Sequence, residues 1–148
     1  MLTLSRIDDI NEILASRETL LGIVSDNPKL QKLLGIGQKA AKLQEVKINL
    51  QSSQIMRSLG SFQRSLNNVA YLSEMSPKCS DLGLRVTCAV RHELSNVLWE
   101  RGESVPSIRI LQDLVENEDF DTQSIPVGRA GLLATLVRLR RRLSAWIT

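Results

Sequence analysis

Apolar residues recur at steps of three and four along most of this chain, a spacing that places them on one face of an α-helix. The clearest example runs from Leu84 to Asn117 and predicts two helices joined by a turn at residues 100–104. Gly102 can take the left-handed conformation that ends the first helix, and Ser104 can cap the second. A turn this short requires the two helices to run antiparallel. Their apolar positions are Val86, Ala89, Val90, Leu94, Val97 and Leu98 in the first helix, and Ile108, Leu111, Leu114 and Val115 in the second.

This central pair has the residue spacing of a tetratricopeptide-like repeat. Small residues at Ser95 and Ser107 would let the two helices approach closely, while Leu98 and Leu111 fill the space beside them. The pattern occurs once more, 42 positions earlier in the chain. Helix pairs that repeat in this way stack into a solenoid, so the predicted fold is all-α, an α-solenoid of antiparallel tetratricopeptide-like helix pairs. The matching residues are Met56, Gly60, Ser65, Val69 and Leu72, against Leu98, Gly102, Ser107, Leu111 and Leu114.

Glycine and proline divide the rest of the chain. We expect a single helical-repeat segment of a larger domain over residues 1–148. It contains N-terminal helices over 4–37, a helix pair over 38–76, the central pair over 82–118 and a final helix over 128–148. Residues 76–81 contain Pro77 and are predicted as a linker. The acidic segment 116–124 is predicted as an exposed, mobile loop.

The final helix carries a long apolar stripe, and no capping residue or covering helix follows it in the sequence. Leu133 also belongs to this stripe. A helix needs partners for its last carbonyl groups and for its apolar face. The pattern therefore predicts a chain cut from a longer protein, with an exposed stripe that mediates protein–protein contact. The residues assigned to this contact are Leu132, Leu136, Leu139, Leu143 and Trp146.

Composition narrows the class of protein. With 148 residues, 43% hydrophobic and 24% charged, the chain can bury a core of its own. No apolar run is long enough to cross a membrane, and two cysteines are too few for a secreted disulfide scaffold. A reducing cytosolic or nuclear compartment is therefore expected.

The net charge of +3 is mildly basic, and only one stretch concentrates it. Arg138, Arg140, Arg141 and Arg142 are expected to form a solvated or salt-bridged helix face, with an acidic partner or nucleic acid as the alternative. The aromatic content of 3% argues against stacking on nucleic-acid bases.

No residue pattern supports chemistry within the chain. The glycines at 35 and 37 precede a lysine-rich helix, but no strand comes before them and the Gly-Lys-Ser/Thr ending of a phosphate loop is missing. Cys88 and His92 lie four residues apart, yet with Cys79 and Asp81 they supply one short spacing where a structural zinc site has two. The same pair lacks the oxyanion hole and third group of a nucleophilic site. We therefore predict no catalytic, cofactor-binding or metal-binding residue.

A series of short motifs follows in a definite order. One helix ends in QIMRSL at residues 54–59, the central pair contains Leu98-Trp99, Glu103-Ser104 and Ile110-Leu111, and LLATL at residues 132–136 opens the last helix. This order resembles the FAT domain of the ATM-type phosphatidylinositol-3-kinase-like kinases, particularly the fungal telomere-maintenance kinases. The resemblance covers most of residues 4–148 and is strongest from Leu84 to Trp146.

The resemblance implies an α-solenoid that wraps a kinase domain elsewhere in the parent protein, contributes to its dimerisation and restrains its activity. The parent would be a nuclear serine/threonine protein kinase in DNA double-strand-break signalling and telomere maintenance. This chain lacks the glycine-rich nucleotide loop, the His-Arg-Asp-like catalytic loop and the Asp-Phe-Gly metal site, so no catalytic residue carries over. The expected role is non-catalytic scaffolding and regulation.

The expected partners are the rest of the parent chain or further copies, with a homodimer in the parent. Direct contact with nucleic acid or with a membrane is not expected. Two alternatives stay open. One is a free-standing helical-repeat adaptor that binds other proteins, and the other is a small enzyme, which the absence of a convergent polar site disfavours. A kinase domain downstream in the same reading frame would separate the fragment from the adaptor.

Overall fold

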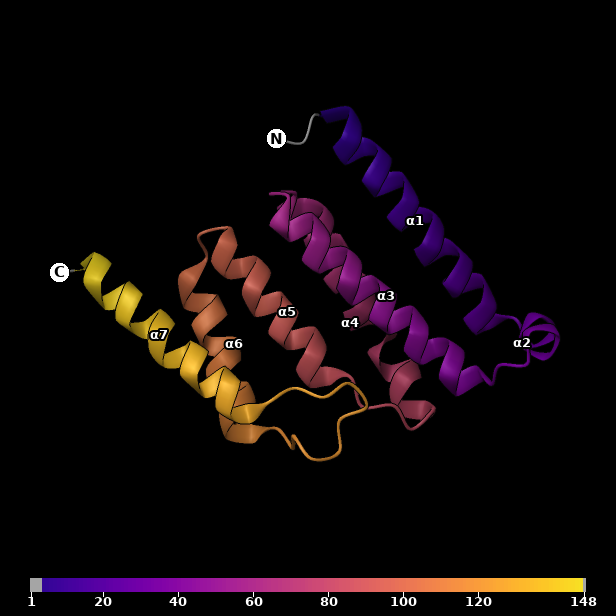
Figure 1. The fold of residues 1–148 in the computed structure, drawn as a ribbon. Helices are drawn as coiled ribbons and strands as arrows, with labels where there is room; N and C mark the ends of the chain where they lie inside the picture. The colour runs from indigo at the N-terminus through magenta and orange to yellow at the C-terminus, as the bar shows by residue number, and fades with distance from the viewer. Residues whose placement is uncertain (1–3, 148) are drawn as a thin grey trace. The chain divides into compact units, whose positions relative to one another are not determined.

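The computed structural model describes the backbone of residues 4–147 and the side chains of residues 6–145. Over these residues the chain forms seven α-helices and no strand, which confirms the predicted all-α class (Figure 1). The helices are α1 (Leu4–Asp26), α2 (Pro28–Leu34), α3 (Gln38–Ser58), α4 (Phe62–Asp81), α5 (Thr87–Glu100), α6 (Ser104–Asn117) and α7 (Arg129–Ile147).

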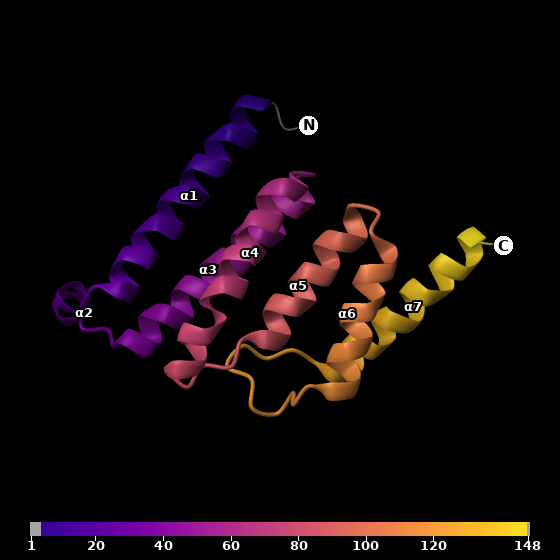
Figure 2. The same cartoon turned by 180° about the vertical axis from the view of Figure 1, so that it is seen from behind.

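The helices divide into two compact units, and the division in the sequence falls between Leu84 and Arg85. In the first unit, α3 packs against both α1 and α4, while the short α2 joins α1 to α3. In the second unit, α6 packs against both α5 and α7, and the same neighbours are seen from either side of the molecule (Figures 1 and 2). Each unit is therefore built around one central helix.

The two helix pairs α3–α4 and α5–α6 share the same close contact. The hydroxyl of Ser65 donates a hydrogen bond of 2.7 Å to the carbonyl of Ser53, and the hydroxyl of Ser107 donates one of 2.7 Å to the carbonyl of Ser95. All four serines are buried. A larger side chain at these positions would hold the backbones apart, so the expectation that small residues allow close approach is confirmed.

The turns of the two pairs are equivalent as well. Gly60 and Gly102 adopt positive φ angles of 82° and 85°, which glycine takes without steric cost. The backbone amide that follows each glycine then bonds back to the carbonyl of Met56 or Leu98, at 2.8 Å in both cases. These bonds satisfy carbonyls that the end of a helix would otherwise leave unpaired. The 42-residue repeat is therefore present in the structure.

Two details of the central pair differ from the expectation. Ser104 is the first residue of α6, not its cap, and the N-terminal end of α6 has no side-chain hydrogen bond. Leu98 is only partly buried, whereas its neighbour Val97 is buried completely, so Leu98 does not fill the core in the way Leu111 does. Spacing alone did not show which of the neighbouring residues Val97 and Leu98 lies at the centre of the buried face.

The linker predicted at residues 76–81 is wrong, because α4 continues through Pro77 to Asp81. Pro77 has no N–H to donate, and a proline inside a helix costs about 3 kcal/mol. The apolar side chains of Leu72, Met75 and Cys79 continue across it and are all buried. Their burial offsets the cost. The helix ends only where Gly83 takes a φ of 76° and the amide of Leu84 bonds to the carbonyl of Cys79 at 2.8 Å.

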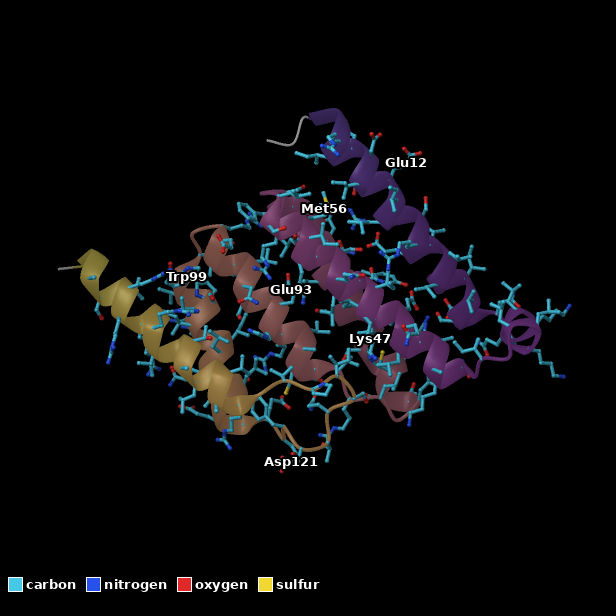
Figure 3. All side chains as sticks on the ribbon, viewed as in Figure 1. Glu12, Lys47, Met56, Glu93, Trp99 and Asp121 are labelled. Carbon is cyan, nitrogen blue, oxygen red and sulfur yellow. The ribbon has the colours of Figure 1, made fainter. Side chains whose placement is uncertain are left out.

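The loop between α6 and α7 is tied to the start of α5. The residue preceding α5 is Val86, which has no polar side chain to cap it. Gln123 of the loop takes that role, since its Oε1 accepts a hydrogen bond of 3.3 Å from the amide of Cys88. Ser124 and Arg85 exchange two further bonds of 2.8 and 2.9 Å. The loop predicted to be exposed and mobile is therefore held to the start of α5 by three hydrogen bonds, and Asp121 near its centre is exposed as predicted (Figure 3).

Replacing Gln123 with alanine is expected to cost about 0.5–2 kcal/mol of unfolding free energy, the range for losing a helix N-cap. Urea unfolding of the full chain measures the change. Gln44→Ala, an exposed glutamine on α3, is the matched control and should stay within about 0.5 kcal/mol of the unmodified chain. Equal midpoints for the two variants would show that the loop does not cap α5.

Candidate functional site

Most of the apolar stripe predicted as a contact surface on α7 lies inside the second unit. Leu132, Leu136 and Leu139 are only 3%, 4% and 6% exposed, and Leu143 is partly buried against the same core. The expectation of an exposed stripe is therefore wrong for the first three leucines. The physical reason is α6, whose own apolar residues cover them. The side chain of Trp146 lies outside the described residues. The covering residues include Ile108, Leu111, Leu114 and Val115.

The opposite side of α7 is the one that stays uncovered. Leu133 and Val137 are 48% and 45% exposed, and the small residues beside them are exposed as well. Further along, Arg138 and Arg141 extend the same side toward the C-terminal end of the helix. We call this surface the α7 open face, and define it as Ala130, Leu133, Ala134, Val137, Arg138 and Arg141.

The arginine cluster separates into two groups. Arg140 donates a hydrogen bond to Gln112 of α6, so it is held within the unit. Arg138, Arg141 and Arg142 are exposed, and in the described part of the chain none of them forms an ion pair. The solvated helix face expected from the sequence is therefore what the structure presents at these three positions.

The first unit contains a cluster of buried charges that the sequence reading missed. Lys42 and Glu45 of α3 are 3% and 0% exposed, and the lysine ammonium lies 3.0 Å from Glu45 Oε1 and 3.1 Å from Asp26 Oδ1. Lys42 also donates to the hydroxyl of Ser25, which in turn donates to Glu45 at 2.6 Å. Tyr71 of α4 donates to the second oxygen of Glu45. We call these five residues the Lys42–Glu45 cluster.

The Lys42–Glu45 cluster joins α1, α3 and α4 through one carboxylate. Burial lowers the pKa of Lys42, but its hydrogen bonds to Glu45 and Asp26 outweigh this, so the pKa of the lysine rises and it stays charged. Burial raises the pKa of Tyr71, so its hydroxyl remains a donor. A Cβ at Gly22 would lie 3.3 Å from Glu45 Oε2, a tight contact, so the glycine lets α1 approach the carboxylate closely. The cluster fixes how α1 sits on α3.

A second set of polar side chains continues this contact along α1. Arg64 of α4 reaches across to Glu18 and donates a bond of 2.8 Å to Asn11 Oδ1, both on α1. Asn68 of α4 donates to Glu18 and, at 3.0 Å, to Asn49 of α3. A groove of about 360 Å³ runs beside these residues. Because the carboxylate of Glu18 is already engaged by Arg64 and Asn68, the arrangement holds three helices together and presents no free base.

The residues weighed as metal ligands or nucleophiles are placed as follows. Cys79 and Cys88 are buried free cysteines, and burial raises the pKa of both thiols, which keeps them in the less nucleophilic protonated form. His92 is partly buried on α5. Among the described residues there is no group of three or more histidine, cysteine, aspartate or glutamate side chains that could hold a metal ion. A membrane-crossing length of apolar helix is likewise not found in the part of the chain that the structure describes.

Comparison with curated proteins gives relatives along almost the whole chain. It is 39% identical over 130 residues to the serine/threonine-protein kinase tel1 of Emericella nidulans, and 40% identical over 131 residues to the kinase of the same name from Aspergillus oryzae. Both alignments cover 88% of this chain. The chain spans only 5% and 4% of the length of these relatives. No protein-family model matches the chain.

Solved structures agree with these relatives. The open conformation of CtTel1 matches with a TM-score of 0.88 and 33% identity over 93% of this chain and 5% of that chain. A structure of the FAT and kinase domain of CtTel1 matches with a TM-score of 0.87 and 32% identity, over 93% of this chain and 10% of that chain. The complete CtTel1 dimer with C2 symmetry gives a TM-score of 0.87.

The fold and these matches define the class: the chain is an all-α solenoid segment from the FAT region of an ATM-type kinase. Within that class it is homologous to one segment of the Tel1 kinases. The family resemblance drawn from the order of motifs in the sequence is confirmed.

Proposed function

We propose that this chain is a non-catalytic scaffolding and regulatory segment of a Tel1-type serine/threonine protein kinase. The main support is the match to the FAT and kinase domain of CtTel1, in which 93% of this chain is matched but only 10% of that chain. A segment that small contributes to a larger architecture. The parent kinase would act in the nucleus, in DNA double-strand-break signalling and telomere maintenance.

The geometry of the first unit supports a mechanical role. A buried ion pair on α3 is bonded there to Ser25 and Asp26 of α1 and to Tyr71 of α4, and Arg64 and Asn68 add further bonds between the helices. All of these bonds have strict distance requirements. Such a contact resists sliding of one helix past another better than a hydrocarbon interface does. A unit of this kind can pass a displacement along the solenoid to the kinase domain and restrain its activity.

Assembly of the parent is part of the proposal. CtTel1 has been solved as a dimer with C2 symmetry, and this chain matches a segment of it. We propose that the parent of this chain forms a homodimer as well, and that the segment contacts the rest of its own chain or a second copy.

The proposal is tested with the parent kinase and the isolated chain side by side. The parent is expected to phosphorylate serine or threonine in a peptide substrate, and the isolated chain is expected to transfer no phosphate. Lys42→Met in the parent should change kcat with little change in the KM for ATP, because this chain lacks the glycine-rich loop that binds the nucleotide in a kinase. Lys47→Met, an exposed lysine on the same helix, is the control and should change neither. Phosphotransfer by the isolated chain, or a parent without a kinase domain in its reading frame, would contradict the proposal.

A further inference from the structure

In both complete helix pairs, the second helix covers the same face of the first. On α3 this face contains Val46, Asn49, Leu50 and Ser53, which are all buried. Asn49 accepts a hydrogen bond from Asn68 of α4, and Ser53 accepts one from Ser65 of α4. The covered face of a first helix is thus marked by direct bonds to the second.

The same face of α5 lies 42 residues further along. It contains Cys88, which is buried, and Arg91, which bonds to Asp113 of α6 at 2.6 Å. Ser95 follows on this face and accepts the bond from Ser107 of α6. His92, the remaining position, is partly buried. The structure therefore repeats both the covered face and the helix that covers it.

One more step of 42 residues leads to the α7 open face. The corresponding residues are Ala130, Leu133, Ala134 and Val137, and all four are exposed. Meanwhile Leu132, Leu136 and Leu139 pack against α6, as the first helix of a following pair would pack on the pair before it. We propose that α7 is the first helix of a third pair, and that the open face binds the second helix of that pair, supplied by the parent chain after α7. This inference rests on the proposed function, because it needs a longer parent chain.

The composition of the open face specifies the helix that would cover it. Leu133 and Val137 require apolar side chains opposite them, and the alanines at 130 and 134 allow a close approach. Arg138, Arg141 and Arg142 lie from the middle of α7 toward its C-terminal end, the end at which an antiparallel partner would begin. Acidic residues in the first turns of that partner would pair with these arginines. The positive end of the partner's helix dipole would also stabilise those acidic residues. The occupant is thus an amphipathic helix that is acidic at its N-terminal end.

Cysteine labelling tests the inference directly. Leu133→Cys and Val137→Cys are prepared singly, in the isolated chain and in the parent kinase, and their rates of reaction with a maleimide are compared. Asp121→Cys in the exposed loop is the control, and the native Cys79 and Cys88 are buried, so their background is slow. Relative to the control, labelling at 133 and 137 should fall by at least about tenfold in the parent. Equal rates in the two proteins would overturn the inference.

Two further measurements distinguish a second copy of the chain from the partner helix and test the acidic character of that helix. If labelling of the isolated chain slows as its concentration rises, and sedimentation shows a dimer, the occupant is a second copy and the inference fails. In the parent, Arg138→Glu together with Arg141→Glu should speed labelling at Val137→Cys, whereas Arg109→Glu on α6 should not. If the double substitution leaves the labelling rate at Val137→Cys unchanged, the partner helix is not acidic at its N-terminal end. If labelling at positions 133 and 137 is slow in the parent but the parent has no kinase activity, only the proposed function is refuted. If the parent is an active kinase but labelling there is as fast as in the isolated chain, only this inference is refuted.

Discussion

Lys42→Met is expected to destabilise the chain by about 3–5 kcal/mol, the range for removing one partner of a buried ion pair. Methionine keeps much of the hydrocarbon volume but removes the ammonium that lies 3.0 Å from Glu45 and 3.1 Å from Asp26. Glu45 would then stay buried with only the hydroxyls of Ser25 and Tyr71 as donors. Urea unfolding of the full chain measures the loss.

Lys47→Met is the matched control, because Lys47 is an exposed lysine on the same helix (Figure 3). Its cost should stay within about 0.5 kcal/mol. Adding Glu45→Gln to Lys42→Met should recover part of the lost unfolding free energy, since the buried carboxylate is then removed together with the buried ammonium. If Lys42→Met and Lys47→Met unfold at the same midpoint, the cluster does not hold α1 on α3.

The effect of pH on the stabilisation by Lys42 has a definite sign. The pKa of Lys42 is raised above its ordinary value of 10.5 in the folded chain. A raised pKa on a lysine contributes stability that is fully present below 10.5 and is lost as the pH rises through the folded value. The stability that the raised pKa of Lys42 contributes to the unmodified chain should therefore be fully present near neutral pH and be lost only in strong alkali.

The sequence predicted the local features of the fold and missed those that depend on distant partners. Gly60, Gly102 and three of the four paired serines, Ser65, Ser95 and Ser107, were found because their roles depend on spacing within one helix pair. The stripe on α7 was also found, but its burial against α6 was not, since a periodic pattern does not say which neighbour will cover it. The role of Gln123 had no signal at all, because it caps a helix that begins 36 residues earlier in the chain.

The Lys42–Glu45 cluster was missed for a different reason. Charged residues are rarely buried, so a search for apolar positions on this helix passes over Lys42 and Glu45. In the structure Ala40 is exposed, while Lys42, Glu45 and Asn49 are buried. These three residues follow the same steps of three and four that mark an apolar stripe. A polar row with helical spacing, opposite a helix that carries glycine at the point of contact, is the signal that could have revealed the cluster.

Leu111→Ala is expected to cost about 2–5 kcal/mol, the range for truncating a leucine in a packed core. Leu111 is completely buried and belongs to the core that α5, α6 and α7 share. A cavity there would loosen both the packing of α5 on α6 and the packing of α7 on α6, because α6 contacts both helices. Thermal or urea unfolding measures the loss, and the amides of α7 should exchange with solvent faster in the variant.

Leu133→Ala is the matched control for Leu111→Ala, since it makes the same chemical change on the open side of α7. Leu133 is 48% exposed, so its truncation should cost no more than about 0.5 kcal/mol in the isolated chain. The two variants therefore separate the covered face of α7 from its open face. If Leu133→Ala proved as costly as Leu111→Ala in the isolated chain, the open face would already be packed, and the assignment of α6 as the only cover of α7 among the described helices would be wrong.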